Sequence, residues 1–102
     1  MGGKSGKNTP HCKLADVQGL ASAGKIRITK SAVIGAAALG FGPAAIVETV
    51  MSLDRRAFRK SMTTYADHRV WQDVYCAMTE AGMVYLKLTV VDDVLVVSFK
   101  EW

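Results

Sequence analysis

Two stretches near the end of the chain, Met83–Val91 and Val94–Lys100, alternate between apolar and polar side chains. A period of two is typical of strands with one buried face and one open face, so this pattern constrains the fold more than any other feature of the sequence. The even-numbered residues of the first stretch and the odd-numbered residues of the second are expected to face the core. We therefore predict two antiparallel strands joined by a two-residue turn at Asp92-Asp93.

The first half of the chain instead has the longer apolar period of helices. We predict one helix that ends before Gly24, a second that stops at Gly40 and a third that starts at Pro43. A short helix after the cap residue Asp54 is expected to carry Arg59. Segments rich in Thr, Val, Trp and Tyr add predicted strands at Ser61–Tyr65 and Val70–Ala77. Helices followed by such a meander predict an α+β fold, with the N-terminal helices on one face of a C-terminal antiparallel sheet.

The positive charge of the chain is unevenly distributed. The formal net charge is +4, with the excess in the first thirty residues and in Asp54–Lys60, whereas the later part is acidic overall. Nucleic acid is a permitted partner, but a uniformly basic surface is excluded. Residues 1–8 read as a flexible basic lead-in, and residues 9–102 as a single domain.

The sequence predicts neither a membrane span nor a metal site. The uncharged stretch Ser31–Val47 is interrupted by Gly40 and Pro43, which favours two short buried helices over one spanning helix. Cys12 and Cys76 lack the spacing of a zinc site or of a disulfide framework. We expect two reduced thiols in a cytoplasmic protein, and no cofactor.

The predicted turn sets the register of the last two strands, and with it a candidate site. It places Tyr85 opposite Lys100 on the open face. The same register pairs Leu86 with Phe99, Leu88 with Val97 and Val91 with Val94. Lys60, which directly precedes the first predicted strand, and Gln72, which lies in the second, are candidates to converge there. These residues form either an ordinary solvated face or an anion-binding face, in which lysines hold a phosphate and the neutral side chains orient it.

Several long segments together resemble one known family. They are Thr9-Pro10-His11, the region 24–32, Lys60–His68, Trp71–Tyr75, Val84–Lys87, Asp93–Leu95 and Val97–Glu101. They closely resemble the MqsR family, the motility quorum-sensing regulator toxins of bacterial type II toxin–antitoxin systems. The resemblance covers nearly all of the chain beyond the lead-in.

This resemblance implies a RelE-like fold and a ribosome-independent endoribonuclease that cleaves mRNA at short GC-starting sites such as GCU. It implies neutralisation by a cognate zinc-containing antitoxin with a DNA-binding helix-turn-helix, so that DNA is contacted only through the antitoxin. It also implies a link to biofilm formation and persistence. The family's functional residues fall here on Lys60, Gln72, Tyr85 and Lys100. We further expect substrate binding by Arg59, His68 and Lys87.

A metal-free mechanism follows from these residue types. The ribose 2′-OH attacks the adjacent phosphate, Lys60 and Lys100 stabilise the developing charge, and Gln72 positions the substrate. Tyr85 orients the phosphate or exchanges a proton with it. A non-catalytic RNA- or protein-binding regulator on the same fold is the alternative. One departure from the family is Cys76–Glu80, which replaces a segment that carries arginines in related toxins; if those arginines bind RNA, affinity or site preference differs here.

Overall fold

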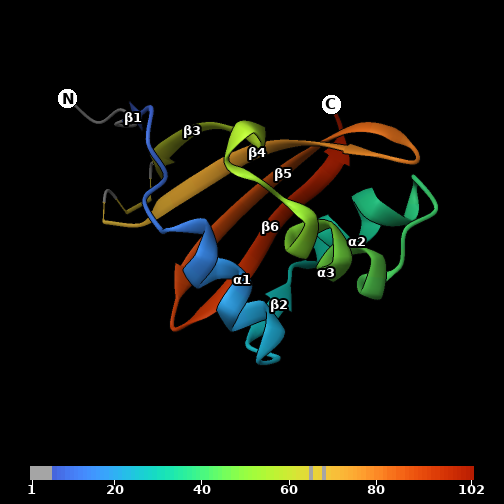
Figure 1. Cartoon of the computed structure of the whole chain (residues 1–102), viewed down its shortest axis with the longest axis horizontal. Coiled ribbons are helices and arrows are strands. Elements are labelled where there is room, and N and C mark those ends of the chain that lie inside the picture. Colours follow the sequence, from blue (N-terminus) through green and yellow to red (C-terminus); the bar gives the residue numbers. More distant parts are fainter. Residues whose placement is uncertain (1–5, 65, 68) are drawn as a thin grey trace.

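The structure is a computed structural model that describes residues 6–64, 66, 67 and 69–102. The chain forms three α-helices, and Figure 1 shows that they lie on one side of a twisted sheet. The elements are β1 (Gly6–Lys7), α1 (Leu14–Ser22), β2 (Ile26–Ile28), α2 (Lys30–Ala37), α3 (Pro43–Ser52), the 3-10 turn η1 (Arg55–Ala57), β3 (Phe58–Thr63), β4 (Trp71–Thr79), β5 (Gly82–Val91) and β6 (Asp93–Glu101). The predicted α+β fold is confirmed.

The sheet has six strands in the order β1-β3-β4-β5-β6-β2. Its C-terminal strands β3 to β6 form the expected antiparallel meander. Two short strands from the N-terminal part extend this meander at its edges, and β2 runs parallel to β6, so the sheet is mixed. Three residues are too few for their apolar pattern to predict a strand, which explains why β2 was not expected.

The helix ends follow the predicted signals. Thr29 caps α2, because its hydroxyl accepts a hydrogen bond from Ala32 N at 3.1 Å and donates one to Val97 O at 2.8 Å. Gly24 follows α1 with a φ of +79°, and Pro43 opens α3. The uncharged stretch Ser31–Val47 thus folds as parts of two separate helices, α2 and α3, as predicted. Within the described ranges, the search for a helix long and apolar enough to span a bilayer finds none.

One hydrophobic core joins the helices to the covered face of the sheet. The helices contribute Val17, Ala21, Ala32, Ala36, Ile46 and Val50, and the sheet contributes Tyr75, Ala77, Val84, Leu86, Leu88, Val94, Val96 and Phe99. Each of these side chains is buried. Because all three helices enter the same cluster, they cover one face of the sheet and leave the other open for chemistry.

The observed register of the β5–β6 hairpin agrees with the predicted pairing far from the turn and differs from it near the turn. Tyr85 pairs with Lys100 and Leu86 with Phe99, as expected. Nearer the turn, Leu88 pairs with Val96 instead of Val97, and Val91 with Asp93 instead of Val94. Val94 and Val96 are therefore completely buried, and the predicted inward positions of Leu95 and Val97 are wrong.

A single backbone conformation explains this shift. The predicted two-residue turn of the commonest primed type needs a positive φ at both central residues, which favours Asn or Gly. Only Asp92 takes a positive φ, of 67°, so the chain turns one residue early. The register irregularity opposite Lys87 and Leu88 leaves Val97 as an extra residue in β6 and restores the pairing beyond it.

The segment before α1 is tied to the sheet by one buried carboxylate. Asp73 in β4 is 5% exposed and accepts hydrogen bonds from His11 N at 3.0 Å and Cys12 N at 3.1 Å. The His11 ring stacks on Trp71, with the Lys7 ammonium 4.2 Å from the Trp71 ring centroid. Gly6 and Lys7, which belong to the predicted lead-in, thus pair with β3, and residues 1–5 lie outside the described residues.

The environment of this carboxylate also raises two pKa values. Burial, and after it the carboxylates of Asp73 and Asp16, raises the pKa of the Cys12 thiol above its ordinary value. Burial, with smaller contributions from Asp73 and Cys12, raises the pKa of Tyr75 to about 12. The buried Tyr75 hydroxyl has no hydrogen-bond partner among the described residues, and burial is the main cause of this rise in pKa.

A pH dependence of stability follows from Tyr75. The unfolded chain loses this proton near pH 10, whereas the folded protein keeps it to about pH 12. The contribution of the protonated Tyr75 to the free energy of unfolding is therefore fully present below about pH 10. It declines by roughly 2–3 kcal/mol as the pH rises toward 12. Tyr75→Phe should remove that part of the decline while changing stability at neutral pH by less than about 1 kcal/mol.

Urea unfolding of both proteins across this pH range tests the prediction. Lysine deprotonation affects wild type and variant alike, so the difference between their pH profiles isolates Tyr75. Profiles that stay parallel above pH 10 would contradict the assignment.

Candidate active site on the open face of the sheet

The face of the sheet opposite the helices carries two rows of side chains across the strands. In an antiparallel pair, directly opposed residues share one face. The first row is Lys60, Val74, Lys87 and Ser98, and the second row is Cys76, Tyr85 and Lys100. Four of the predicted site residues, Lys60, Lys87, Tyr85 and Lys100, are thus collected on one face by strand pairing alone.

Tyr85 is the centre of this face. The ammonium group of Lys100 lies 5.1 Å from the centroid of its ring, and that of Lys87 lies 5.8 Å away. A cation within about 6 Å of an aromatic ring is attracted to it, which holds both ammonium groups beside the phenol. Tyr85 is half-buried and Lys100 exposed, so a ligand can reach both.

Lys60 and Gln72 share this face but lie farther from Tyr85. Lys60 is opposite Val74, and Gln72 precedes Val74 by two residues on β4, a separation of about 7 Å along the strand. In the part of the chain that the structure describes, neither side chain makes a hydrogen bond. Both are therefore available to a bound ligand that spans the strands.

Arg59 reaches the same face because it lies in β3. The prediction of a short helix that carries Arg59 after Asp54 is therefore wrong. Only one 3-10 turn forms there, and Arg59 lies at an irregularity in β3 between Phe58 and Lys60. Its Nη1 donates hydrogen bonds to Arg56 O at 3.1 Å and Phe58 O at 3.3 Å. β propensity and pairing with β4 override the short helical pattern.

Trp102 is not among the predicted site residues, yet it lies beside two of them. The Arg59 guanidinium lies 5.9 Å from the Trp102 ring centroid, and the Trp102 and Tyr85 rings are 6.0 Å apart. Trp102 thereby links Arg59 to Tyr85. The period of two in the last strand, continued from Lys100 by two residues, was the signal that could have placed it on this face.

His68 lies outside the described residues, and its expected role in substrate binding stays a prediction. The neighbouring loop residues Asp67 and Arg69 form an ion pair at 3.0 Å, and the Asp67 carboxylate raises the pKa of Arg69. Among the described residues there is no group of three or more His, Cys, Asp or Glu side chains that could hold a metal ion.

The charges of this face suit an anion. Arg59, Lys60, Lys87 and Lys100 supply four cationic groups from three different strands. Their positions are set by strand pairing, so the positive potential is in place before a ligand binds. A phosphodiester that crosses the strands beside Tyr85 would meet these groups in turn.

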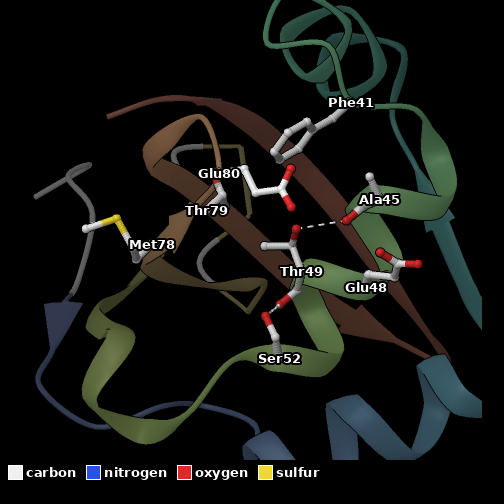
Figure 2. Close-up of a pocket in the computed structure, with 8 residues that line it drawn as sticks. All are labelled: Phe41, Ala45, Glu48, Thr49, Ser52, Met78, Thr79 and Glu80. Carbon is white, nitrogen blue, oxygen red and sulfur yellow. Dashed lines mark hydrogen bonds between the residues drawn. The ribbon is translucent and has the colours of Figure 1, made fainter.

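Two concavities of the described surface lie away from this face. The first has a volume of about 290 Å³ and lies between α3 and the β4–β5 hairpin. Figure 2 shows the side chains that line it, with the carboxylates of Glu48 and Glu80 at its sides. Thr49 and Ser52 donate their hydroxyl hydrogens to carbonyl groups of α3. Part of the Cys76–Glu80 departure lines this acidic pocket, where two carboxylates would repel a phosphate. A second groove, of about 610 Å³, lies between the N-terminal segment, α1 and η1.

Two comparisons with known proteins identify the family of this chain. A family model described as "motility quorum-sensing regulator, toxin of MqsA" matches residues 9–101. The mRNA interferase toxin MqsR of Escherichia coli (strain K12) is 48% identical over 95 residues, which cover 93% of this chain and 97% of that protein. The match begins at Thr9 and includes every strand of the antiparallel meander. The chain therefore belongs to the MqsR toxin family.

Proposed function

We propose that this chain is an mRNA interferase, an endoribonuclease that cleaves mRNA on the open face of its sheet. The observation that carries the proposal is the pairing of Tyr85 with Lys100, with the Lys87 ammonium on the same phenol. Lys60 and Gln72 from the neighbouring strands complete the site. The E. coli relative is named an mRNA interferase toxin, and this supports the proposal.

The proposed chemistry uses the ribose of the RNA as nucleophile. The 2′-hydroxyl gives up its proton as its oxygen attacks the adjacent phosphorus. The bond from phosphorus to the 5′-oxygen breaks, and that leaving oxygen takes up a proton. The products are a 2′,3′-cyclic phosphate and a 5′-hydroxyl. Lys60 and Lys100 stabilise the charge that develops on the phosphorane, and Gln72 positions the substrate. Tyr85 orients the phosphate or exchanges a proton with it.

Substrate choice and partner belong to the same proposal. The substrate is mRNA cut at short GC-starting sites such as GCU, and Arg59, His68 and Lys87 bind it. The basic lead-in adds attraction to phosphates that selects no sequence. The partner is an antitoxin of the MqsA kind, which the family description names. It is proposed to be a zinc-containing helix-turn-helix protein that neutralises the toxin in the cytoplasm and alone contacts DNA.

The test is to incubate the purified protein with a defined mRNA in excess EDTA and to map the ends. We expect cuts at recurring GC-starting sites, each with a 5′-hydroxyl end, on the timescale of minutes to hours. RNA that stays intact in the presence of folded protein would contradict the proposal and favour a non-catalytic RNA- or protein-binding regulator.

A further inference from the structure

Trp102 lies immediately beyond the residues that the family model matches, and beside the proposed catalytic tyrosine. We infer that Trp102 is a platform on which a nucleobase of the RNA stacks, next to the phosphate that is cleaved at Tyr85. This inference rests on the proposed function, because it assigns a subsite to the same RNA.

The backbone places Trp102 on the open face. Its N–H donates a hydrogen bond to Met83 O at 3.1 Å, which continues the pairing of β5 with β6 beyond Glu101. Trp102 follows Lys100 by two residues and therefore extends from the same side of the strand. The indole is thus held by the sheet, although Trp102 is 59% exposed.

The surroundings of the ring distinguish it from an ordinary exposed aromatic residue. The Trp102 and Tyr85 rings are tilted by 31° with centroids 6.0 Å apart, and the Arg59 guanidinium lies 5.9 Å from the indole. Backbone carbonyl groups fix that guanidinium through two hydrogen bonds. An exposed indole bounded by a phenol and a fixed guanidinium offers planar surfaces to a third planar group.

The charges nearby identify that group as part of a nucleic acid. Lys87 and Lys100 flank Tyr85, so a ligand that reaches Trp102 passes beside groups that select phosphates. Single-stranded RNA combines such phosphates with bases that stack on aromatic rings and on arginine. A phosphate at Tyr85 therefore brings a neighbouring base to Trp102. Because every base has a π-face, the platform adds affinity with little sequence preference.

Binding at Trp102 can be observed without catalysis. The chain has two tryptophans, and Trp71→Phe leaves Trp102 as the only indole. Trp71 stacks on His11 in the N-terminal segment, away from Tyr85. The probe is a short RNA with a single GCU in which the 2′-hydroxyls are methylated, so that it binds without being cut. We expect saturable quenching of the fluorescence, and weaker quenching when the base beside the cut position is removed.

The kinetic test separates stacking from a structural role. Trp102→Ala should raise KM about tenfold with kcat nearly unchanged, because stacking contributes to ground-state and transition-state binding alike. Trp102→Phe should retain most of the affinity, whereas Trp102→Leu, which keeps apolar bulk but lacks a π-face, should resemble the alanine variant. Val91→Ala is the matched control, since Val91 is also 59% exposed but lies at the turn of the same hairpin.

Three outcomes decide between the explanations. Loss of the Trp102→Ala effect on RNA that lacks the neighbouring base would support stacking. An unchanged KM and no quenching, in a protein that still cuts RNA, would overturn the inference and leave the proposed function intact. Failure of the wild-type protein to cut any RNA would contradict the proposed function itself, whatever the fluorescence shows.

Discussion

Lys100→Ala is expected to lower the rate of RNA cleavage about a hundredfold or more while leaving the protein folded. The reason is that its ammonium group, beside the Tyr85 ring, meets the charge that develops on the phosphorane. Lys100 is exposed and makes no contribution to the core, so the thermal midpoint should hardly change. Tyr85→Phe should cause a loss of similar size while keeping the ring in place.

The measurement is kcat/KM on a defined RNA, with urea unfolding as the check on folding. Lys30→Ala is the matched control, because Lys30 is an exposed lysine at the start of α2, the element packed on the covered face. Lys100→Arg keeps the charge with a different geometry and should fall between wild type and the alanine variant. In the double variant of Tyr85 and Lys100, the losses should not add, because both groups act on one phosphate. Full activity of Lys100→Ala would contradict the assigned role.

Gly35→Ala is expected to destabilise the fold by about 2–3 kcal/mol or more. Gly35 lies in α2, which packs against β6, and a Cβ atom there would overlap the backbone carbonyl of Phe99. Backbone cannot move aside as a side chain can, so the helix and the strand must separate. Alanine normally stabilises a helix by about 1 kcal/mol relative to glycine, and the overlap outweighs that gain.

Gly19→Ala provides the matched comparison. Gly19 is an exposed residue within α1, and a Cβ atom there would meet no heavy atom within 4 Å. We expect this variant to be more stable by about 0.5–1 kcal/mol. Urea unfolding of the two variants should thus give opposite signs. If Gly35→Ala proved as stable as Gly19→Ala, the close packing of α2 on β6 would be contradicted. Because Phe99 directly precedes Lys100, Gly35→Ala should also lower cleavage activity.

The pairing of Tyr85 with Lys100 could be predicted from sequence, although the turn that was assumed for it was wrong. The chain turns one residue early at Asp92, and one extra residue at Val97 compensates. Alternation of apolar residues determines which face a strand buries only while the register stays regular. The extra residue therefore reversed the inward side for Leu95 without affecting the pairs beyond it.

Other parts of the site depended on tertiary structure. Arg59 entered the open face because pairing with β4 extended β3 back to Phe58, and no local pattern required that. Trp102 gained its position from a hydrogen bond to β5. The parallel strand β2 has only three residues and depends on β6 as a partner. Such features arise from contacts between segments that are distant in the sequence. The spacing of apolar residues and the capping residues of helices do not predict those contacts.

The central claim is that Tyr85 and Lys100 promote attack by the RNA's own 2′-OH. The most direct test is cleavage of a short RNA with one GCU, compared with the same RNA carrying a single 2′-deoxynucleotide at the cut position, both in excess EDTA. We predict that the wild-type protein binds both RNAs with similar affinity and cuts only the first, and that Lys100→Ala binds but cuts slowly. Equal cleavage of the deoxy-substituted RNA at that position would contradict the account.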